Sequence, residues 1–171
     1  MDSLACVRIG QTAPDFHCSA VTQGLIDDVT ISSYINEKKQ WLILLFIPTA
    51  FSLIAKTEVL AFRGCLDVFE DRNCNVMFCS VNQSYTLWHW QNLPLRYGGL
   101  GQIEVTLLSD ATRKMSRDYG VYMEEKGVCL RSMFVIDSNG IIRQVTHNPL
   151  LTVPSVHQAL RLLDTAQAAA K

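Results

Sequence analysis

The chain has 171 residues, of which 49% are hydrophobic and 18% charged, and its formal net charge is −1. This composition excludes a disordered chain, and the length predicts a single domain over residues 1–171 that buries roughly 70% of its unfolded surface. The basic residues are scattered, which argues against binding to nucleic acid or to an anionic membrane.

The sequence shows neither a membrane-spanning run nor a secretory signal. The apolar run WLILLF (41–46) is far shorter than the ~18 residues of a membrane span, and the N-terminus lacks the basic-then-apolar order of a signal peptide. We therefore expect a cytoplasmic protein. The six cysteines form no C-x-x-C pair and no zinc spacing with histidines, so no metal site and no cofactor are expected.

The first half of the chain predicts a βαβ unit. DDVTISSYI (27–35) indicates a short strand followed by a turn of helix, and WLILLFI (41–47) is apolar on both faces, as a central parallel strand is. Ser52 is a candidate N-cap for a helix whose apolar residues recur at 59, 62, 66 and 69. NVMFCSVN (75–82) is the next buried strand.

The second half predicts two more helices, a hairpin and a final helix. YTLWHWQNL (85–93) is the first of these helices, and DATRKMSRDYG (110–120) is the second, capped by Asp110 and closed by Gly120. CLRSMFVIDSNGIIRQVTH (129–147) predicts a hairpin around Ser-Asn-Gly. The last helix opens with a capping box from Ser155 to Gln158.

This order of elements predicts an α/β protein with a thioredoxin-like fold, a central mixed sheet flanked by helices. In open α/β sheets the chemistry lies at the carboxyl ends of the strands. Loop 47–56, which follows the apolar strand and leads into a helix, is therefore the expected position of an active site.

Several motifs resemble those of the typical 2-Cys peroxiredoxins, from about Val7 to Leu163. They are IGQTAPDF (9–16), TEVLAF (57–62), the Trp and Asn of WHWQN (88–92), GGLG (98–101), SRDYGV (116–121), FVIDSNGIIRQVTHN (134–148) and SVHQALRLL (155–163). The resemblance implies the peroxiredoxin type of thioredoxin-like fold. It also implies a thiol peroxidase, in which a thiolate at a helix mouth attacks peroxide and a second cysteine, near the partner subunit's C-terminus, resolves the sulfenic acid.

Carried over position by position, the resemblance preserves only part of that site. Pro48 matches the active-site proline, Ser52 replaces the threonine, Glu58 matches the orienting acid, and Arg131 matches the first arginine. Ala55 stands at the position of the peroxidatic cysteine. Alanine can neither ionise nor be oxidised, whereas peroxide cleavage needs a thiolate.

Other positions also depart from the family pattern. Ile47 replaces the tyrosine before the proline, Lys56 replaces the proline after the cysteine, and Pro154 stands where the second arginine is expected. The resemblance places the resolving cysteine beyond Lys171. These departures favour natural loss of the standard peroxidase activity over an engineered change at residue 55 alone.

Three functions follow from these observations as alternatives. The first is a catalytically degenerate scaffold, chaperone-like or regulatory protein with a residual anion-binding pocket. The second is a repurposed enzyme that combines Arg131 with Lys56, Cys129 or His147 as acid, base or nucleophile. The third is a thioredoxin-dependent peroxidase whose cysteine at position 55 has been replaced by engineering.

Each candidate residue of the pocket has a functional role and a purely structural role as alternatives. Ser52, Lys56 and Arg131 would surround a helix N-terminus and bind a small anion or a carboxylate-bearing ligand, unless Lys56 simply points to solvent. Cys129 lies two residues before Arg131, so on a single strand both side chains would face the same side of the sheet. Cys129 is then either a relocated nucleophile or a residue that fills space beside the pocket. His147, at the end of the hairpin, could replace a lost polar group.

The resemblance also implies self-association. Peroxiredoxins form dimers, and typical members assemble further into rings of dimers. The segment 47–54, with Ile47, Leu53 and Ile54, would lie close to the ring interface as an apolar contact surface. An active peroxiredoxin relative is a further expected partner.

Overall fold

The computed structural model describes residues 7–152 and 155–171. Seven strands form one mixed sheet in the order β2-β1-β5-β4-β3-β8-β9, and β6 and β7 form a separate two-stranded sheet. The strands are β1 (His17–Thr22), β2 (Leu25–Thr30), β3 (Trp41–Phe46), β4 (Cys74–Ser80), β5 (Thr106–Ser109), β6 (Tyr122–Met123), β7 (Val128–Cys129), β8 (Ser132–Ile136) and β9 (Ile142–His147).

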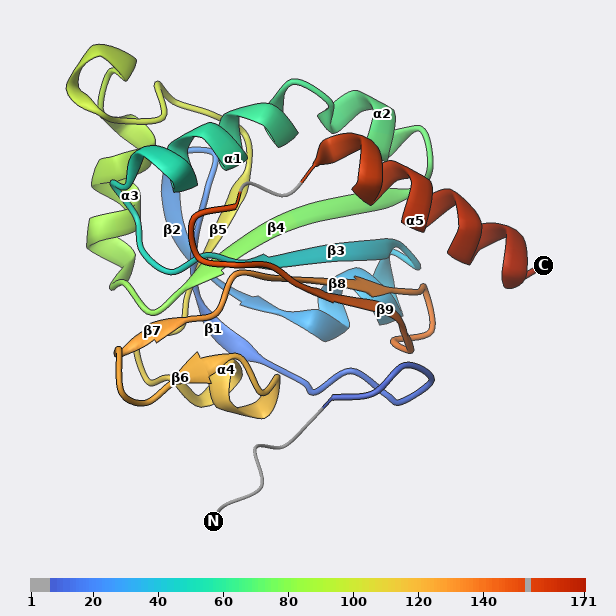
Figure 1. Ribbon diagram of the computed structural model, residues 1–171. Coiled ribbons are helices and arrows are strands. Elements are labelled where there is room, and N and C mark those ends of the chain that lie inside the picture. Colours follow the sequence, from blue (N-terminus) through green and yellow to red (C-terminus); the bar gives the residue numbers. More distant parts are fainter. Residues whose placement is uncertain (1–6, 153–154) are drawn as a thin grey trace.

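Helices cover both faces of this sheet. They are the π-helix η1 (Ser33–Glu37), α1 (Leu53–Arg63), α2 (Leu66–Glu70), α3 (Ser84–Asn92), the 3-10 helix η2 (Leu95–Tyr97), α4 (Lys114–Asp118) and α5 (Val156–Ala169). Figure 1 shows α1, α2 and α5 together on one face, with α4 and the β6–β7 pair on the opposite face. The predicted α/β fold with a central mixed sheet flanked by helices is confirmed.

Strand β3 lies in the middle of the sheet, and all six of its residues are buried. It pairs in parallel with β4 and antiparallel with β8, so both of its edges are hydrogen-bonded, and a cluster of buried side chains covers each of its faces. Ile43 and Leu45 point into the cluster beneath α1, whereas Leu42, Leu44 and Phe46 point into the cluster on the other face. The continuous apolar run that predicted a central strand is thus divided between two cores.

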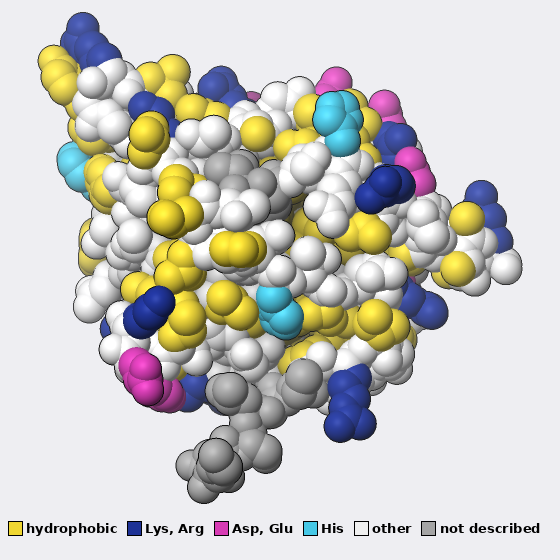
Figure 2. Space-filling model, in the orientation of Figure 1, with side chains coloured by type: hydrophobic (Ala, Val, Ile, Leu, Met, Phe, Trp, Pro, Cys, Tyr) yellow, Lys and Arg dark blue, Asp and Glu magenta, His cyan; other side chains and the backbone are white. Residues whose placement is uncertain are grey.

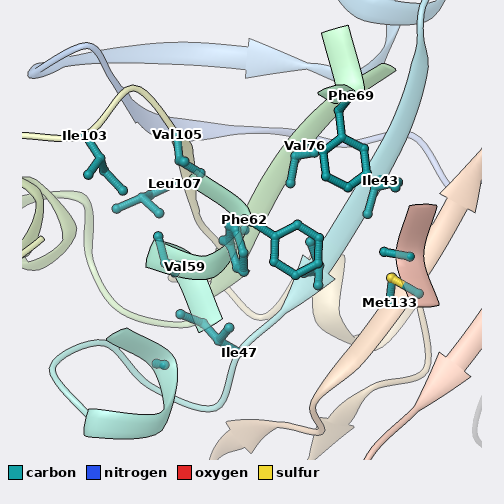
Figure 3. Close-up of a cluster of buried hydrophobic side chains, with 14 of the residues drawn as sticks. Ile43, Ile47, Val59, Phe62, Phe69, Val76, Ile103, Val105, Leu107 and Met133 are labelled. Atoms are coloured by element: carbon teal, nitrogen blue, oxygen red, sulfur yellow. The ribbon is translucent and has the colours of Figure 1, made fainter. Parts of the chain in front are cut away.

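The first core lies between the sheet and helices α1, α2 and α5 (Figure 3). Phe62 of α1 stacks on Phe69 of α2 at 5.8 Å between ring centroids and meets Phe78 of β4 edge-on at 5.7 Å. Each fully buried phenylalanine contributes about 1.5–3 kcal/mol relative to an exposed one. This packing holds α1, and therefore its N-terminus, in a fixed position over the sheet.

The helix predicted from residue 52 to residue 69 is interrupted. Helix α1 ends at Arg63, and α2 begins at Leu66 after Gly64 and Cys65. Glycine is among the weakest helix formers, and Cys65 has non-helical backbone angles. The apolar spacing continues across the break because both helices pack on the same core.

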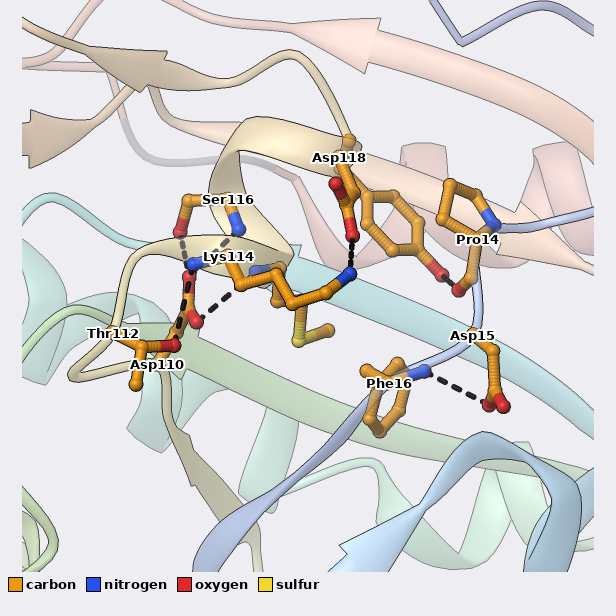
Figure 4. Close-up of polar contacts among 10 residues, drawn as sticks. Pro14, Asp15, Phe16, Asp110, Thr112, Lys114, Ser116 and Asp118 are labelled. Atoms are coloured by element: carbon orange, nitrogen blue, oxygen red, sulfur yellow. Dashed lines mark hydrogen bonds and ion pairs between the residues drawn. The ribbon is translucent and has the colours of Figure 1, made fainter.

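Helix α4 is shorter than the predicted helix over 110–120. The chain enters it through Arg113, whose φ of 65° is left-handed, and Asp110 accepts hydrogen bonds from the N–H groups of Met115 (3.1 Å) and Ser116 (2.7 Å). Figure 4 shows this carboxylate below Ser116, with Lys114 reaching Asp118. Asp110 therefore caps the helix from several residues away.

The sequence patterns missed β1, β5 and the β6–β7 pair. Strand β5 has only four residues and β6 and β7 have two each, which is too short for an alternation to be recognised. Within residues 7–152 and 155–171, no helix combines the length and the apolar character that crossing a bilayer would require.

Candidate functional site

The candidate site lies at the N-terminus of α1, beyond the carboxyl end of β3. The N–H of Ile47 donates to the carbonyl of Cys79 (2.9 Å), which holds the loop against the end of β4. Ser52 is the N-cap: its Oγ accepts from the N–H of Ala55 at 3.1 Å, and its carbonyl accepts from the N–H of Lys56 at 3.0 Å. The predicted cap is confirmed.

Residue 55 is completely buried in the first turn of this helix. Glu58 lies three residues further along the same buried face and is also inaccessible to solvent. Its carboxylate forms an ion pair with the guanidinium of Arg131, which is itself only 1% exposed. The structure therefore places an alanine methyl group on the helix face that carries a buried carboxylate and its arginine.

Arg131 is fixed by the backbone on its other side. Its Nε donates to the carbonyl of Leu150 at 3.2 Å, and its own carbonyl accepts from the N–H of Asn148 at 2.8 Å. Burial lowers the pKa of the Arg131 guanidinium, because an apolar environment disfavours the charged form. The adjacent Glu58 carboxylate supplies the opposing charge.

Lys56 does not join Arg131 in an anion pocket. Its ammonium donates to the carbonyl of Leu95 in η2 at 2.7 Å, so it points neither freely to solvent nor toward the buried guanidinium. The hydroxyl of Ser52 is occupied by the cap. The expected anion site of Ser52, Lys56 and Arg131 is therefore not assembled, because each of the three polar groups already has a protein partner.

The expected placement of Cys129 beside Arg131 is wrong. Cys129 ends β7 and β8 begins only at Ser132, so the two-residue alternation of a single strand does not connect Cys129 to Arg131. Cys129 is fully buried in the core on the α4 face, where its Sγ lies 3.1 Å from Ser116 Oγ. Burial raises the pKa of its thiol to about 11, which disfavours the thiolate that a nucleophile needs.

His147 is exposed at the end of β9, and its polar contact is with Ser132. The ring Nδ1 lies 2.8 Å from Ser132 Oγ on the neighbouring strand. Pro48 is half-buried at the end of the β3 strand. Pro154, at the position of the second arginine, lies outside the described residues.

Sequence reasoning missed two connections. One is the hydrogen bond from Lys56 to η2, and the other is the buried chain from Asp110 through Ser116 to Cys129, in which Ser116 Oγ donates to the Asp110 carboxylate at 2.5 Å. The Lys56–Leu95 and Ser116–Cys129 contacts have no sequence signal, because each joins separate elements through the tertiary packing, whereas Asp110 is the cap that the sequence predicts.

A thioredoxin-like sheet with a capped helix mouth beside a buried Glu–Arg pair defines the class of this protein. The model of the AhpC/TSA family matches residues 9–145, and the chain belongs to this family, the peroxiredoxins. The chain is 41% identical to peroxiredoxin TSA1 of Saccharomyces cerevisiae over 160 residues, 94% of this chain and 80% of that relative. It is 39% identical to a thioredoxin peroxidase of Echinococcus granulosus over 93% of this chain and 81% of that protein.

Solved structures agree with this assignment. The reduced 2-Cys peroxiredoxin of Plasmodium vivax superposes with a TM-score of 0.90 at 36% identity, covering 95% of this chain and 83% of that one. Plasmodium yoelii Prx1a modified at the N-terminus, described as forming an artifactual octamer, gives a TM-score of 0.87 at 33% identity, covering 95% of this chain and 93% of that one. The structural relatives thus include an oligomer, in line with the expected self-association.

These comparisons contradict the functional expectation drawn from residue 55. The expectation was a catalytically degenerate scaffold, chaperone-like or regulatory protein, with a repurposed or engineered enzyme as the alternative. Relatives about 40% identical over most of the chain are named peroxiredoxins and thioredoxin peroxidase, and the described residues retain five free cysteines. The expectation failed because it weighed a few site positions above the similarity of nearly the whole chain.

Proposed function

We propose that this protein acts in thiol-dependent peroxide reduction, as a peroxiredoxin-type peroxidase. The observation that carries the proposal is the 41% identity to peroxiredoxin TSA1 over 94% of the chain. The buried Glu58–Arg131 pair on the helix that Ser52 caps gives it structural support. In this proposal Pro48, Ser52, Glu58 and Arg131 form the frame of the site around residue 55.

Alanine has no sulfur, so the attacking thiol has to come from another cysteine. Cys18 and Cys65 retain partial solvent access among the described cysteines, and Cys65 at the α1–α2 junction is the leading candidate. Cys65 lies at the opposite end of α1 from residue 55, so its reaction would take place outside the frame around that residue. Burial raises the pKa of Cys18 and of Cys74 to about 12, which disfavours both. The thiolate would attack the O–O bond, giving a sulfenic acid and water, and a dithiol donor such as thioredoxin would restore the thiol with release of a second water.

The test is a coupled assay with hydrogen peroxide, thioredoxin, thioredoxin reductase and NADPH. We expect peroxide-dependent NADPH oxidation that needs the chain, is lost in Cys65→Ser and is retained in the matched control Cys74→Ser. The proposal would be overturned if the wild-type chain were inactive and the Ala55→Cys variant active. The residues around position 55 would then support peroxide reduction, but the protein itself would not be a peroxidase.

We also propose that the protein works as a homodimer in the cytoplasm, with an active peroxiredoxin relative as an alternative partner. The outer edge of β9, the last strand of the sheet, offers backbone groups for antiparallel pairing with a second copy. Light scattering coupled to size exclusion checks the mass. Val145→Pro should yield monomers if this edge forms the dimer, whereas an unchanged dimer would exclude this edge as the interface.

A further inference from the structure

Strand β2 forms the edge of the main sheet at the opposite end from β9. Figure 1 shows β2 beside α3, at the end of the sheet where no further described strand follows. Its register with β1 is continuous, without a bulge, and the strand contains no proline. Residues 25–28 are exposed to solvent. Over these residues β2 therefore lacks the bulges, prolines and covering segments that usually keep an edge strand from pairing.

The backbone of β2 bonds to β1 only at alternate residues. The N–H of Ile31 donates to the carbonyl of Phe16 at 3.4 Å, and the β1–β2 ladder continues in the same register. In an antiparallel ladder, hydrogen-bonded and non-hydrogen-bonded pairs alternate. Residues 25, 27 and 29 therefore bond to β1. Ile26 and Asp28 fall in the other pairs, so their N–H and C=O groups point toward the open edge.

The open stretch of this edge is short. No described residue bonds to the backbone of Ile26. The N–H of Asp28 donates to the carboxylate of Asp27 at 2.8 Å. At the end of the strand, the carbonyl of Thr30 accepts from the Ser33 hydroxyl at 2.8 Å. The edge is thus open over residues 26–28, and a cation that drew the Asp27 carboxylate away would free the N–H of Asp28.

The side chains along the open stretch are acidic on both faces. Neighbouring residues of a strand point to opposite faces, so Asp27 and Asp28 place one carboxylate on each side of the edge. Residues 9–37 contain no lysine or arginine, and neither does α3, which packs on β2. Figure 2 shows lysine and arginine side chains at separate places around the visible face. The imidazole of His17 lies 3.6 Å from the Asp28 carboxylate.

These charges separate the classes of occupant. Antiparallel pairing of two copies around residues 27 and 28 would set like charges opposite each other, which is destabilising. A nucleic acid would bring phosphates to the same carboxylates. We propose that β2 accepts, by strand addition, an extended segment of a partner protein in which two adjacent lysine or arginine residues are flanked by apolar ones. The adjacent cations would point to opposite faces and meet the two carboxylates. The flanking residues would meet Leu25 and Ile26, which are 72% and 38% exposed.

A short fluorescein-labelled peptide, with a Lys-Lys pair between valine and threonine residues, provides the probe. Fluorescence anisotropy measures its affinity for the full chain. We expect the same peptide with a Glu-Glu pair to bind at least roughly tenfold more weakly. Asp27→Asn/Asp28→Asn should lose a similar factor for the Lys-Lys peptide. The matched control Asp67→Asn/Glu70→Gln, with the same change in net charge on α2, should bind it like wild type.

Backbone pairing has its own readout. Hydrogen exchange followed by nuclear magnetic resonance should show the amides of Ile26 and Asp28 protected at least roughly tenfold by the bound peptide. The amide of Asp27, which already bonds to β1, should change less. The peptide N-methylated at both lysines keeps its charges but loses one donor on each edge, so its binding should be lost.

Four outcomes would overturn the proposal. Equal affinity for the Lys-Lys and Glu-Glu peptides would show that the carboxylates select no partner. Unchanged affinity of the N-methylated peptide would reduce the interaction to attraction between charges. Binding without protection of the Ile26 amide would place the peptide elsewhere. Protection of that amide in the free chain, rising with protein concentration, would assign the edge to a second copy.

Discussion

Glu58 and Arg131 form an ion pair that is closed off from solvent beneath the first turns of α1. The pair joins α1 to Arg131, the residue that precedes β8, and so connects the helix of the candidate site to the central sheet. Its charges depend on each other, because neither has access to water. In a peroxiredoxin with alanine at residue 55, this pair is the principal charged feature of the site.

Breaking this pair should destabilise the protein. Arg131→Met leaves the Glu58 carboxylate buried without a counter-charge, which costs about 3–5 kcal/mol of unfolding free energy. Urea denaturation followed by circular dichroism measures the loss. The double variant Glu58→Leu/Arg131→Met removes both charges and should recover most of it; a double variant no more stable than Arg131→Met would contradict this explanation.

Restoring a thiol at residue 55 should create a reactive cysteine. In Ala55→Cys the sulfur would sit in the first turn of α1, on the helix face whose Glu58 pairs with Arg131, and both the helix N-terminus and a nearby cation lower a thiol pKa. We expect its reaction with hydrogen peroxide to exceed that of a free thiol by roughly 10²-fold, the size of one electrostatic contribution in an active site.

Stopped-flow kinetics with a sulfenic-acid trap measures this rate. Ala55→Ser is the matched control, which alters the same position without a sulfur. A thiol at residue 55 reacting no faster than free cysteine would show that Arg131 is too tightly held by Glu58 to assist it.

Removing the cap of α1 should weaken the helix mouth. The Ser52 hydroxyl satisfies the N–H of Ala55, so Ser52→Ala should cost about 1 kcal/mol, measured by urea denaturation. Ser84, the first residue of α3, makes no side-chain cap in the structure, and Ser84→Ala should change stability by no more than about 0.5 kcal/mol. Equal effects of the two substitutions would refute the capping role.

The buried thiol of Cys129 should reduce stability at alkaline pH. Its folded pKa is raised from 9.0 to about 11, mainly by burial, so the unfolded chain loses the proton first as pH rises. The contribution of the protonated Cys129 thiol to the free energy of unfolding is therefore complete below pH 9 and is lost between pH 9 and about 11. By linkage it amounts to about 2–3 kcal/mol. Denaturation at successive pH values should show a smaller decline for Cys129→Ala, and an identical decline would contradict the assignment.

The sequence alone determined those features that depend on near neighbours in the chain. The apolar run from Trp41 to Phe46 has no polar face, which is typical of a central strand covered on both sides. Ser52 and Ser155 cap helices by reaching N–H groups three residues away, a contact that is local by nature. Asp137 and Gly140 close the hairpin between β8 and β9 for the same reason, with Gly140 at a φ of 82°.

The tertiary structure alone decided which side chains share a surface. Cys129 and Arg131 are two residues apart, yet they lie apart because the chain leaves one sheet and enters another between them. Lys56 and Leu95, which are 39 residues apart, meet because α1 and η2 flank the same corner. Strand alternation and helical periodicity hold only within one element. Contacts between elements depend on how their packed faces meet, and a single sequence does not display that.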